Sequence, residues 1–424
     1  MSNTKILVAG DTGSIHTARF VSLLQEIGYD VRVFKSEYHF HQDEHLHNTT
    51  IYVSHFSAHP INGNTLRDPA SFEITPQSGL LGSAIKIAQR IVNSLYIRGF
   101  RYEYLRGFHR YSEPETRSMA LAKTIHKWKP DIVFSLKMQD DGYTVSAAKD
   151  ILGADFGAKW IHFNWGTDIE FFGKHPDYVD EHLPKIRHLL AHCDYLIADC
   201  MRDVQQAIDY GFQGGNLGMC LANGGYALND LSEIRAKADQ NRDVILVKGR
   251  QGALVGKAFN VLEALHRIPQ VASQYKIKII MADSETRGAA NMLSRIDGIN
   301  YEVLPRLPYQ ELLALFATSR MAISASDVDG TPSFLTEAMS MGAFPIHSDM
   351  SSVREWITDG ENGLLFPVDD IAALAACIEK AHKDQQLVES ARLINWKIAT
   401  DRMDRNKIRL HVRELVETVN DKWK

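Results

Sequence analysis

The sequence predicts an α/β protein of two doubly wound domains, each built on a parallel β-sheet. The chain has 424 residues, more than one hydrophobic core usually accommodates, so two domains of roughly 200 residues each are expected. Short apolar segments typical of strands alternate with helical patterns in an early and a late block of the chain. A glycine-containing loop joins the first strand to the first helix, as in a β-α-β unit.

The early block opens with an expected strand at Ile6–Ala9, followed by the loop Gly10–His16. A helix over Thr17–Ile27 should end at Gly28, and Asp30–Phe34 should form the next strand. This order implies parallel pairing of the two strands. The pattern continues with expected strands at Asp131–Ser135, Trp160–Phe163 and Tyr195–Ala198.

The late block contains five further expected strands, namely Val244–Val247, Ile277–Met281, Tyr301–Leu304, Met321–Ser324 and Phe344–His347. Segment 223–242, which begins with Asn223-Gly-Gly225 and is rich in charge, is the expected linker. The domains are therefore expected at 1–225 and 240–400, with a separate helix over 404–424 packing back on the first domain. Two such domains would present the carboxyl ends of their strands to a shared cleft, where ligands of these folds bind.

Composition and charge exclude several classes of protein. Hydrophobic residues make up 45% and charged residues 23% of the chain, as in an ordinary soluble protein. The net charge of −5 supplies no basic field to attract nucleic acid. The four cysteines show no zinc-ligand spacing, so free thiols in a reducing compartment are expected. No run of 18 apolar residues and no signal peptide are evident, which favours a cytoplasmic location.

The most informative segment is Ser326–Gly342. Thr331 is a suitable N-cap, Pro332 a suitable first helical residue and Gly342 a suitable C-terminal stop, so a helix is expected from Pro332 to Met341. The backbone N–H groups of its first turn, together with the helix dipole, form an anion-binding site. That turn contains Ser333 and Phe334, which together with Thr331 are candidate donor-binding residues.

Two carboxylates flank the start of this helix. Asp329 and Glu337 lie eight positions apart, so that one can face a sugar while the other reaches a ribose. With the following Gly342–Ile346 and the downstream Asp359–Pro367, they resemble the E-x7-E motif of retaining glycosyltransferase family 4, which has the GT-B fold. The resemblance implies two Rossmann-like domains, a C-terminal helix that crosses back to the first domain, and no bound metal.

The resemblance also implies that Glu337 holds the donor ribose. Asp329 stands where the family has its first Glu, so the contact with the donor sugar is made by a shorter side chain. Asp327-Val-Asp329 also spells the DxD pattern that holds a metal in other glycosyltransferases, and this alternative stays open.

A diphosphate leaving group needs fixed cations when no metal is present. Lys248 and Arg250 follow an expected strand, and Lys257 opens the next expected helix. The family uses an Arg and a Lys in this neighbourhood to bind the diphosphate. Arg250 and Lys257 match by order, and Lys248 is a competing candidate because the spacing is longer than usual.

In the first domain, the loop Gly10–His16 is a candidate binding loop, since small residues such as Gly13 allow a ligand to approach backbone N–H groups. The family resemblance implies that this loop touches the donor phosphate or the acceptor, and Gly13 is a candidate donor-binding residue. His16 is a candidate catalytic residue, with helix capping as the alternative. Asn164–Asp168 follows an expected strand and resembles a family segment that lines the cleft. Asp168 would bind the acceptor or orient the sugar, and a structural turn is the alternative.

Segment 85–111 carries six basic residues and one acid, with aromatic residues between them. This composition suits peripheral contact with the inner face of a membrane or an anionic acceptor. A solvated helical face is the simpler alternative.

The sequence therefore predicts a metal-independent, cofactor-free retaining glycosyltransferase. Its donor would be a UDP-, GDP- or ADP-sugar carrying a hexose-type sugar, and its acceptor a saccharide, lipid-linked or other hydroxyl compound. A GT-B nucleotide-sugar epimerase is one alternative. The other is a non-catalytic nucleotide- or carbohydrate-binding partner subunit, suggested by Asp329 in place of Glu.

Overall fold

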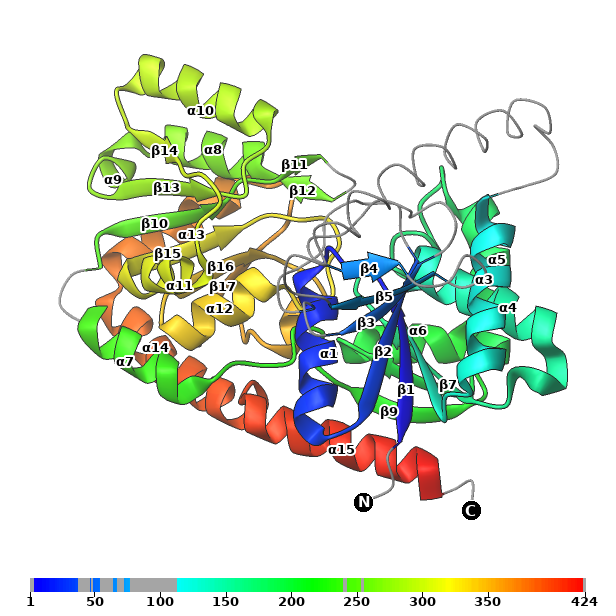
Figure 1. Ribbon diagram of the computed structural model, residues 1–424. Coiled ribbons are helices and arrows are strands. Elements are labelled where there is room, and N and C mark those ends of the chain that lie inside the picture. The colour runs from blue at the N-terminus through cyan, green and yellow to red at the C-terminus, as the bar shows by residue number, and fades with distance from the viewer. Residues whose placement is uncertain are drawn as a thin grey trace. The chain divides into compact units, whose positions relative to one another are not determined.

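The computed structural model describes residues 4–36, 46, 49–53, 64–66, 72–76, 113–238, 242–252 and 255–421 (Figure 1). The chain forms two compact units, Met1–Gly224 with Arg409–Lys424, and Gly225–Ile408. The basic and aromatic segment 85–111 lies outside the described residues. Within the described residues, no helix combines the length and apolar character needed to cross a membrane.

The first unit contains one nine-stranded sheet in the order β4-β5-β3-β2-β1-β6-β7-β8-β9. From β3 to β9 neighbouring strands run parallel, whereas β5 pairs antiparallel with β3 and with β4. This order confirms the α/β fold expected from the sequence. The strands are β1 (Lys5–Gly10), β2 (Asp30–Lys35), β3 (Thr50–Val53), β4 (Asn64–Leu66), β5 (Phe72–Pro76), β6 (Ile132–Leu136), β7 (Lys159–Asn164), β8 (Tyr195–Ala198) and β9 (Gly215–Met219).

The helices of the first unit cover a continuous apolar core. The side chains of Leu7, Val133 and Trp160 are fully buried in it, which explains why the central strands read as near-continuous apolar runs. The first helix ends at Gly28, whose φ of 102° is a conformation that favours glycine. The described helices that lie wholly in this unit are α1 (Ile15–Ile27), α3 (Glu113–Trp128), α4 (Tyr143–Leu152), α5 (Val179–His192) and α6 (Met201–Asp209), with a π-helical turn at Met138–Gly142 and a 3-10 turn at Gly153–Phe156.

The second unit contains a six-stranded, wholly parallel sheet in the order β14-β13-β10-β15-β16-β17. A short antiparallel hairpin, β11 (Gln251–Gly252) with β12 (Gly256–Lys257), follows the first strand. The other strands are β10 (Val244–Lys248), β13 (Lys276–Ile280), β14 (Tyr301–Val303), β15 (Ser319–Ser324), β16 (Phe344–Ser348) and β17 (Leu364–Phe366).

In the second unit, α8 packs against α10 and α13, and α12 packs against α7, α11 and α14 (Figure 1). Their bounds are α7 (Leu228–Ala238), α8 (Ala258–Arg267), α9 (Pro269–Ala272), α10 (Ser284–Asp297), α11 (Tyr309–Thr318), α12 (Ser333–Met341), α13 (Ile371–Lys383) and α14 (Gln385–Arg402), with a 3-10 turn at Val353–Glu355.

The expectation that 223–242 is a linker is wrong for most of that segment. The units divide at Gly224, but residues 228–238 form α7, which packs against α11 and α12. The helix buries Leu228 and Leu231, leaves Asp230 and Glu233 exposed, and directs Arg235 to the carbonyl of Ser340 in α12 (2.7 Å). Its charge content therefore reflects a half-solvated helix and not a flexible connection.

The expected helix at the central motif is present, with one correction at its start. The N-cap is Pro332, in an extended conformation, and not Thr331. The Thr331 hydroxyl instead accepts a hydrogen bond from the indole N–H of Trp356 (3.1 Å). The helix ends as expected at Gly342, which has a φ of 78°. Arg242 donates to the carbonyl groups of Met341 and Gly342 and so satisfies this end.

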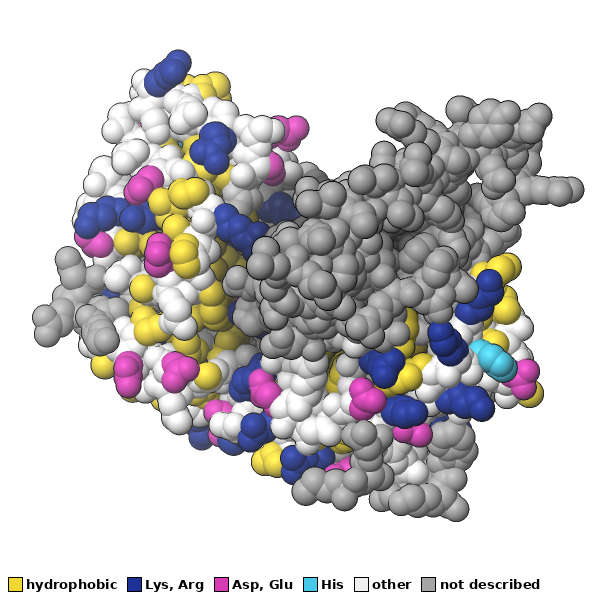
Figure 2. All heavy atoms as spheres, viewed as in Figure 1, with side chains coloured by type: hydrophobic (Ala, Val, Ile, Leu, Met, Phe, Trp, Pro, Cys, Tyr) yellow, Lys and Arg dark blue, Asp and Glu magenta, His cyan; other side chains and the backbone are white. Residues whose placement is uncertain are grey.

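Helix α15 (Arg405–Asp421) begins in the second unit and belongs to the first unit from Arg409 onward. Near its end, Asn420 donates a hydrogen bond to the hydroxyl of Thr4 (3.4 Å). Acidic and basic side chains are interspersed over the visible described surface, without separation into large fields of one sign (Figure 2).

Candidate active site

A lysine and an aspartate meet at the carboxyl edge of the second sheet. Lys248 is the last residue of β10, and Asp329 lies on the loop between β15 and α12. The ammonium nitrogen of Lys248 is 3.3 Å from Oδ2 of Asp329, and the lysine side chain is only 15% exposed. Ser352 donates its hydroxyl to the Asp329 carbonyl (2.8 Å), which holds the loop in place. The cation is therefore fixed in position before any ligand arrives.

A second lysine faces the same loop. Lys257 donates its backbone N–H to the carbonyl of Ala325 (3.1 Å), and Asp327 donates its N–H to that of Val255 (2.9 Å). These bonds attach the β11–β12 hairpin to the loop that precedes α12. The Lys257 ammonium group lies 3.2 Å from Asp327 and 3.8 Å from Asp369. Both lysines therefore contact the loop that carries the DxD carboxylates, Lys248 at Asp329 and Lys257 at Asp327.

The amino end of α12 completes this group. The first hydrogen bond of the helix runs from the N–H of Thr336 to the carbonyl of Pro332 (3.1 Å), so the N–H groups of Ser333 and Phe334 precede it in the first turn. Such N–H groups favour an anion. Glu337 lies in the second turn and is 8% exposed. Thr336 is held by the hydroxyl of Tyr226 (2.6 Å).

Arg250 takes a different position from the two lysines. Its backbone carbonyl accepts a hydrogen bond from the N–H of Ala258 (3.1 Å), so its main chain belongs to the same region. Its side chain is exposed and forms no ion pair within the described parts of the chain. Of the three candidate cations, Lys248 has the most buried side chain.

Sequence reasoning missed His347, in β16. It is 2% exposed, and its Nε2 is buried with no hydrogen-bond partner among the described residues. Burial lowers its pKa to about 4, despite a hydrogen bond to the Ser348 carbonyl, and the charge of Lys248 acts in the same direction as burial. The imidazole is therefore neutral at pH 7. Its place near the end of a parallel strand was the one signal that could have identified it.

We expect His347 to make the second unit sensitive to acid. An unfolded histidine titrates near pH 6.5, so below that pH the unfolded state binds a proton that the native state excludes until about pH 4. Stability is fully present above pH 6.5 and falls as the pH drops, by about 2 kcal/mol at pH 5. Hydrogen exchange of peptides from the second sheet at pH 7.5 and 5, corrected for intrinsic rates, should show this loss.

The His347→Asn variant should lose most of this pH dependence, whatever its stability at pH 7.5. The matched control is His382→Asn, because His382 contacts Tyr275 (3.0 Å) in the same unit and is only partly buried. It should keep the wild-type slope. Parallel slopes for wild type and His347→Asn would contradict the assignment.

In the first unit, Gly13 and His16 lie at the start of α1. The N–H of Gly13 donates to Oδ1 of Asp11 (2.8 Å) within a tight turn. Ser14 is the N-cap of the helix, so His16 is not a capping residue. The imidazole of His16 packs edge-on against the indole of Trp165, with ring centroids 5.8 Å apart. The two candidate loops of this unit therefore contact each other.

Asp168 is buried and holds two turns together. Its Oδ2 accepts hydrogen bonds from the N–H groups of Met138 (2.8 Å) and Trp165 (2.9 Å). Burial raises its pKa to about 7, against the opposing effect of these two hydrogen bonds. This geometry favours the structural-turn alternative for Asp168 over direct contact with a sugar.

A buried polar group in the helical turn Met138–Gly142 was also missed. Asp141 is fully buried and accepts a hydrogen bond from the Ser36 hydroxyl, while its Oδ2 has no partner among the described residues. Burial raises its pKa well above the usual range. The neighbouring Lys137 and Asp140 have φ of 63° and 62°, unusual for non-glycine residues. The Asp140-Asp141 doublet after a strand was the available sequence signal.

Residues 232–395 match the family model described as glycosyl transferases group 1. No match to a curated protein was found. Sucrose-phosphate synthase from Thermosynechococcus elongatus aligns with a TM-score of 0.68 at 15% identity, over 99% of this chain and 100% of that one. HepE of Anabaena in complex with UDP and glucose aligns with a TM-score of 0.65 at 14% identity, over 98% of this chain and 100% of that one.

The pneumococcal O-GlcNAc transferase GtfA in complex with UDP and GlcNAc gives a TM-score of 0.65 at 11% identity, over 99% of both chains. These solved structures establish the fold, which is the GT-B fold of glycosyltransferases. The family match covers α7 to most of α14 and supports an enzyme of the glycosyltransferase class. It includes Lys248, Lys257, Asp329 and Glu337.

Proposed function

We propose that this chain transfers a hexose-type sugar from a nucleotide-diphosphate sugar to a hydroxyl acceptor, with retention of configuration at the anomeric carbon. The observation that carries the proposal is the group formed by Lys248, Lys257 and the amino end of α12 at the carboxyl edge of the second sheet. This group lies in the segment that matches the glycosyl transferases group 1 model. Retention rests on the resemblance to family 4.

In this proposal, the fixed cations stabilise the leaving diphosphate. Negative charge grows on the phosphate oxygens as the bond to the anomeric carbon breaks, and donors already oriented need no reorganisation at that moment. Lys248 meets this requirement best, because its position is set by Asp329. Lys257 is about one-third exposed and can exchange Asp327 for a phosphate oxygen. The side chain of Arg250 is exposed and would contact the diphosphate once the donor has bound.

The two carboxylates have separate roles. Glu337, in the second turn of α12, accepts hydrogen bonds from the ribose hydroxyls. Asp329 contacts the hydroxyls of the donor sugar while keeping its ion pair with Lys248. We assign no residue of the second unit to acceptor binding. The loop at Gly13 stays a candidate for contact with the donor phosphate or the acceptor. Asn164–Asp168 stays a candidate for acceptor contacts, with Asp168 acting through the turns it holds.

We propose that the reaction needs no metal. The carboxylates of Asp327 and Asp329 lie 3.2 and 3.3 Å from ammonium groups, so a divalent cation at the DxD pattern would meet two positive charges. Turnover should therefore persist in EDTA. Complete loss in EDTA, with recovery on adding Mg²⁺ or Mn²⁺, would favour the DxD alternative.

The decisive experiment screens UDP-, GDP- and ADP-sugars by thermal shift, and then measures turnover of each sugar that binds. UDP-sugars come first, because HepE and GtfA were solved with UDP. Transfer to an acceptor supports the proposal. Isomerised donor without acceptor would favour an epimerase, and binding with neither transfer nor donor hydrolysis would favour a non-catalytic partner subunit.

A further inference from the structure

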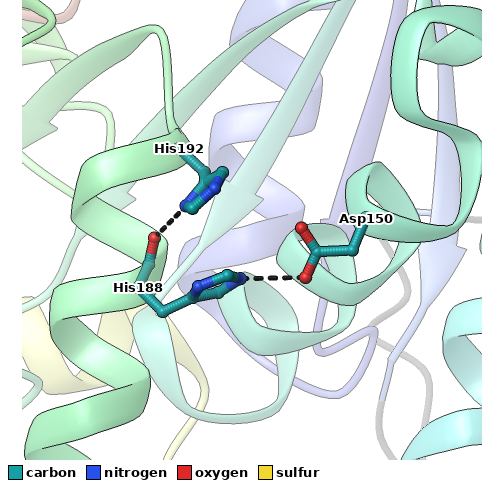
Figure 3. Close-up of side chains that lie close together, drawn as sticks. All are labelled: Asp150, His188 and His192. Carbon is teal, nitrogen blue, oxygen red and sulfur yellow. Dashed lines mark hydrogen bonds and ion pairs between the residues drawn. The ribbon is translucent and has the colours of Figure 1, made fainter.

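A second cluster of polar side chains lies in the first unit, outside the groups described above. His188 and His192 are four positions apart on α5, and Asp150 faces them from α4 (Figure 3). Nε2 of His188 is 2.8 Å from Oδ2 of Asp150, and the two imidazole centroids are 4.2 Å apart. One potential ligand atom from each of the three side chains lies within 4.8 Å of the others. All three side chains are exposed to solvent.

The hydrogen bonds of the cluster set the imidazole tautomers that a metal needs. Nδ1 of His192 is 2.7 Å from the backbone carbonyl of His188, which can only accept, so Nδ1 carries the proton. In the neutral ring the lone pair is then on Nε2. A backbone carbonyl on the other ring nitrogen is the usual support of a metal-binding histidine. The proton between His188 and Asp150 occupies the position that a cation would take.

Charged side chains contact this cluster. The ammonium group of Lys149 donates to the carbonyl of His192 (2.7 Å). The same ammonium group lies 3.4 Å from the carboxylate of Asp194, which balances its charge. Asp150 then supplies a negative charge that no lysine or arginine in these contacts neutralises.

We propose that Asp150, His188 and His192 form a binding site for a divalent transition-metal ion of the Zn²⁺ type. Two imidazoles and one carboxylate match the ligand preference of Zn²⁺ and, with water in the fourth position, its tetrahedral geometry. Mg²⁺ and Ca²⁺, which prefer oxygen ligands, should not bind. The bound ion would cross-link α4 to α5.

The site is structural or regulatory and not part of the transfer chemistry. Helix α5 ends at His192, just before β8 begins at Tyr195, so the cluster lies at the amino edge of the first sheet. Asp168 follows the carboxyl end of β7, at the opposite edge. The proposal therefore stands independently of the proposed sugar transfer.

The test is peptide-level footprinting of the full chain with diethylpyrocarbonate, with and without Zn²⁺. Metal-bound imidazoles do not react, so Zn²⁺ should protect His188 and His192, whereas Mg²⁺ should not. The internal control is His266, which pairs with Asp297 (3.0 Å) and has no second histidine among its contacts in the described residues. Peptide-level readout matters because the sequence contains other histidines, including His39, His41, His45 and His47.

In the Asp150→Asn variant, protection of both histidines should require at least about tenfold more Zn²⁺. In His188→Ala, protection of His192 should be lost. Because these side chains are exposed, the variants should keep the wild-type circular dichroism spectrum. Equal modification of His188 and His192 with and without Zn²⁺ would overturn the proposal. Protection unchanged in Asp150→Asn would overturn the three-residue site.

Discussion

The Lys248→Ala variant is expected to turn over its donor sugar about 100- to 1000-fold more slowly than wild type. This is the range measured when one preorganised donor to a developing negative charge is removed, about 3–4 kcal/mol of the barrier. Lys248 belongs in this range because its ammonium group is largely buried and held 3.3 Å from Asp329. Steady-state kinetics with the nucleotide sugar that binds best provides the measurement.

The matched control is Lys278→Ala, which removes another partly buried lysine paired with a carboxylate, Glu302 (3.6 Å), in the same sheet. It should leave turnover within about twofold of wild type, since surface ion pairs contribute little. A second control distinguishes two effects of removing Lys248: lost stabilisation of the leaving diphosphate, and the loss of the ion-pair partner of Asp329. If the loss came only from an unpaired Asp329, adding Lys248→Ala to Asp329→Asn would lower turnover no further than Asp329→Asn alone. Full activity of Lys248→Ala would remove Lys248 from the mechanism.

The Glu337→Ala variant is expected to bind UDP about 10- to 150-fold more weakly than wild type. Hydrogen bonds to a charged group contribute about 1.5–3 kcal/mol, and Glu337 is 8% exposed, so water does not replace it fully. Isothermal titration calorimetry with UDP alone is the measurement, because UDP contains the ribose but no sugar. If another base proves to be preferred, its diphosphate replaces UDP.

Two comparisons sharpen this result. Asp329→Ala should weaken binding of the UDP-sugar more than binding of UDP, because only the former carries the donor sugar. Glu311→Ala, on the exposed side of the neighbouring helix α11, should leave both affinities unchanged. A folded Glu337→Ala protein with wild-type affinity for UDP would show that the ribose contact is wrong.

Most of the central strands could be predicted from the sequence, because parallel strands buried on both faces read as apolar runs. The expected strand at Tyr195–Ala198 matches β8, and the other expected strands differ at their ends by two residues or fewer. Strands β9 and β17 were missed for physical reasons. The first contains two glycines in five residues, and the second has only three residues. Their pairing is decided by the sheet and not by local propensity.

Helix α7 was taken for a linker because its charge was visible in the sequence and its tertiary partners were not. The same limit applies to Thr331, whose hydroxyl is used by Trp356, 25 positions later. An N-cap is predicted from neighbours in sequence, so a distant competitor for the side chain cannot be foreseen.

The candidate donor residues could be predicted as a group but not ranked. A strand end brings Lys248 and Arg250 to the same edge, but only packing decides that one is fixed by Asp329 and the other exposed. For Asp168, the sequence suggested a direct chemical role that the structure does not favour. Its position after a strand suggested chemistry, whereas its burial and two backbone hydrogen bonds indicate that it shapes the loops. His347 was not identified as a candidate because it was counted as part of the apolar strand pattern, where a buried neutral histidine also occurs.

The route of the chain through α15 has a consequence for biosynthesis. The second unit is one continuous segment, Gly225–Ile408, whereas the first unit takes its last part from Arg409–Lys424. A ribosome that has made the whole second unit has therefore not yet released all of the first. The hydrogen bond between Asn420 and Thr4 joins groups 416 positions apart, so it cannot form until translation is nearly complete. The unit that is begun first is the unit that is finished last.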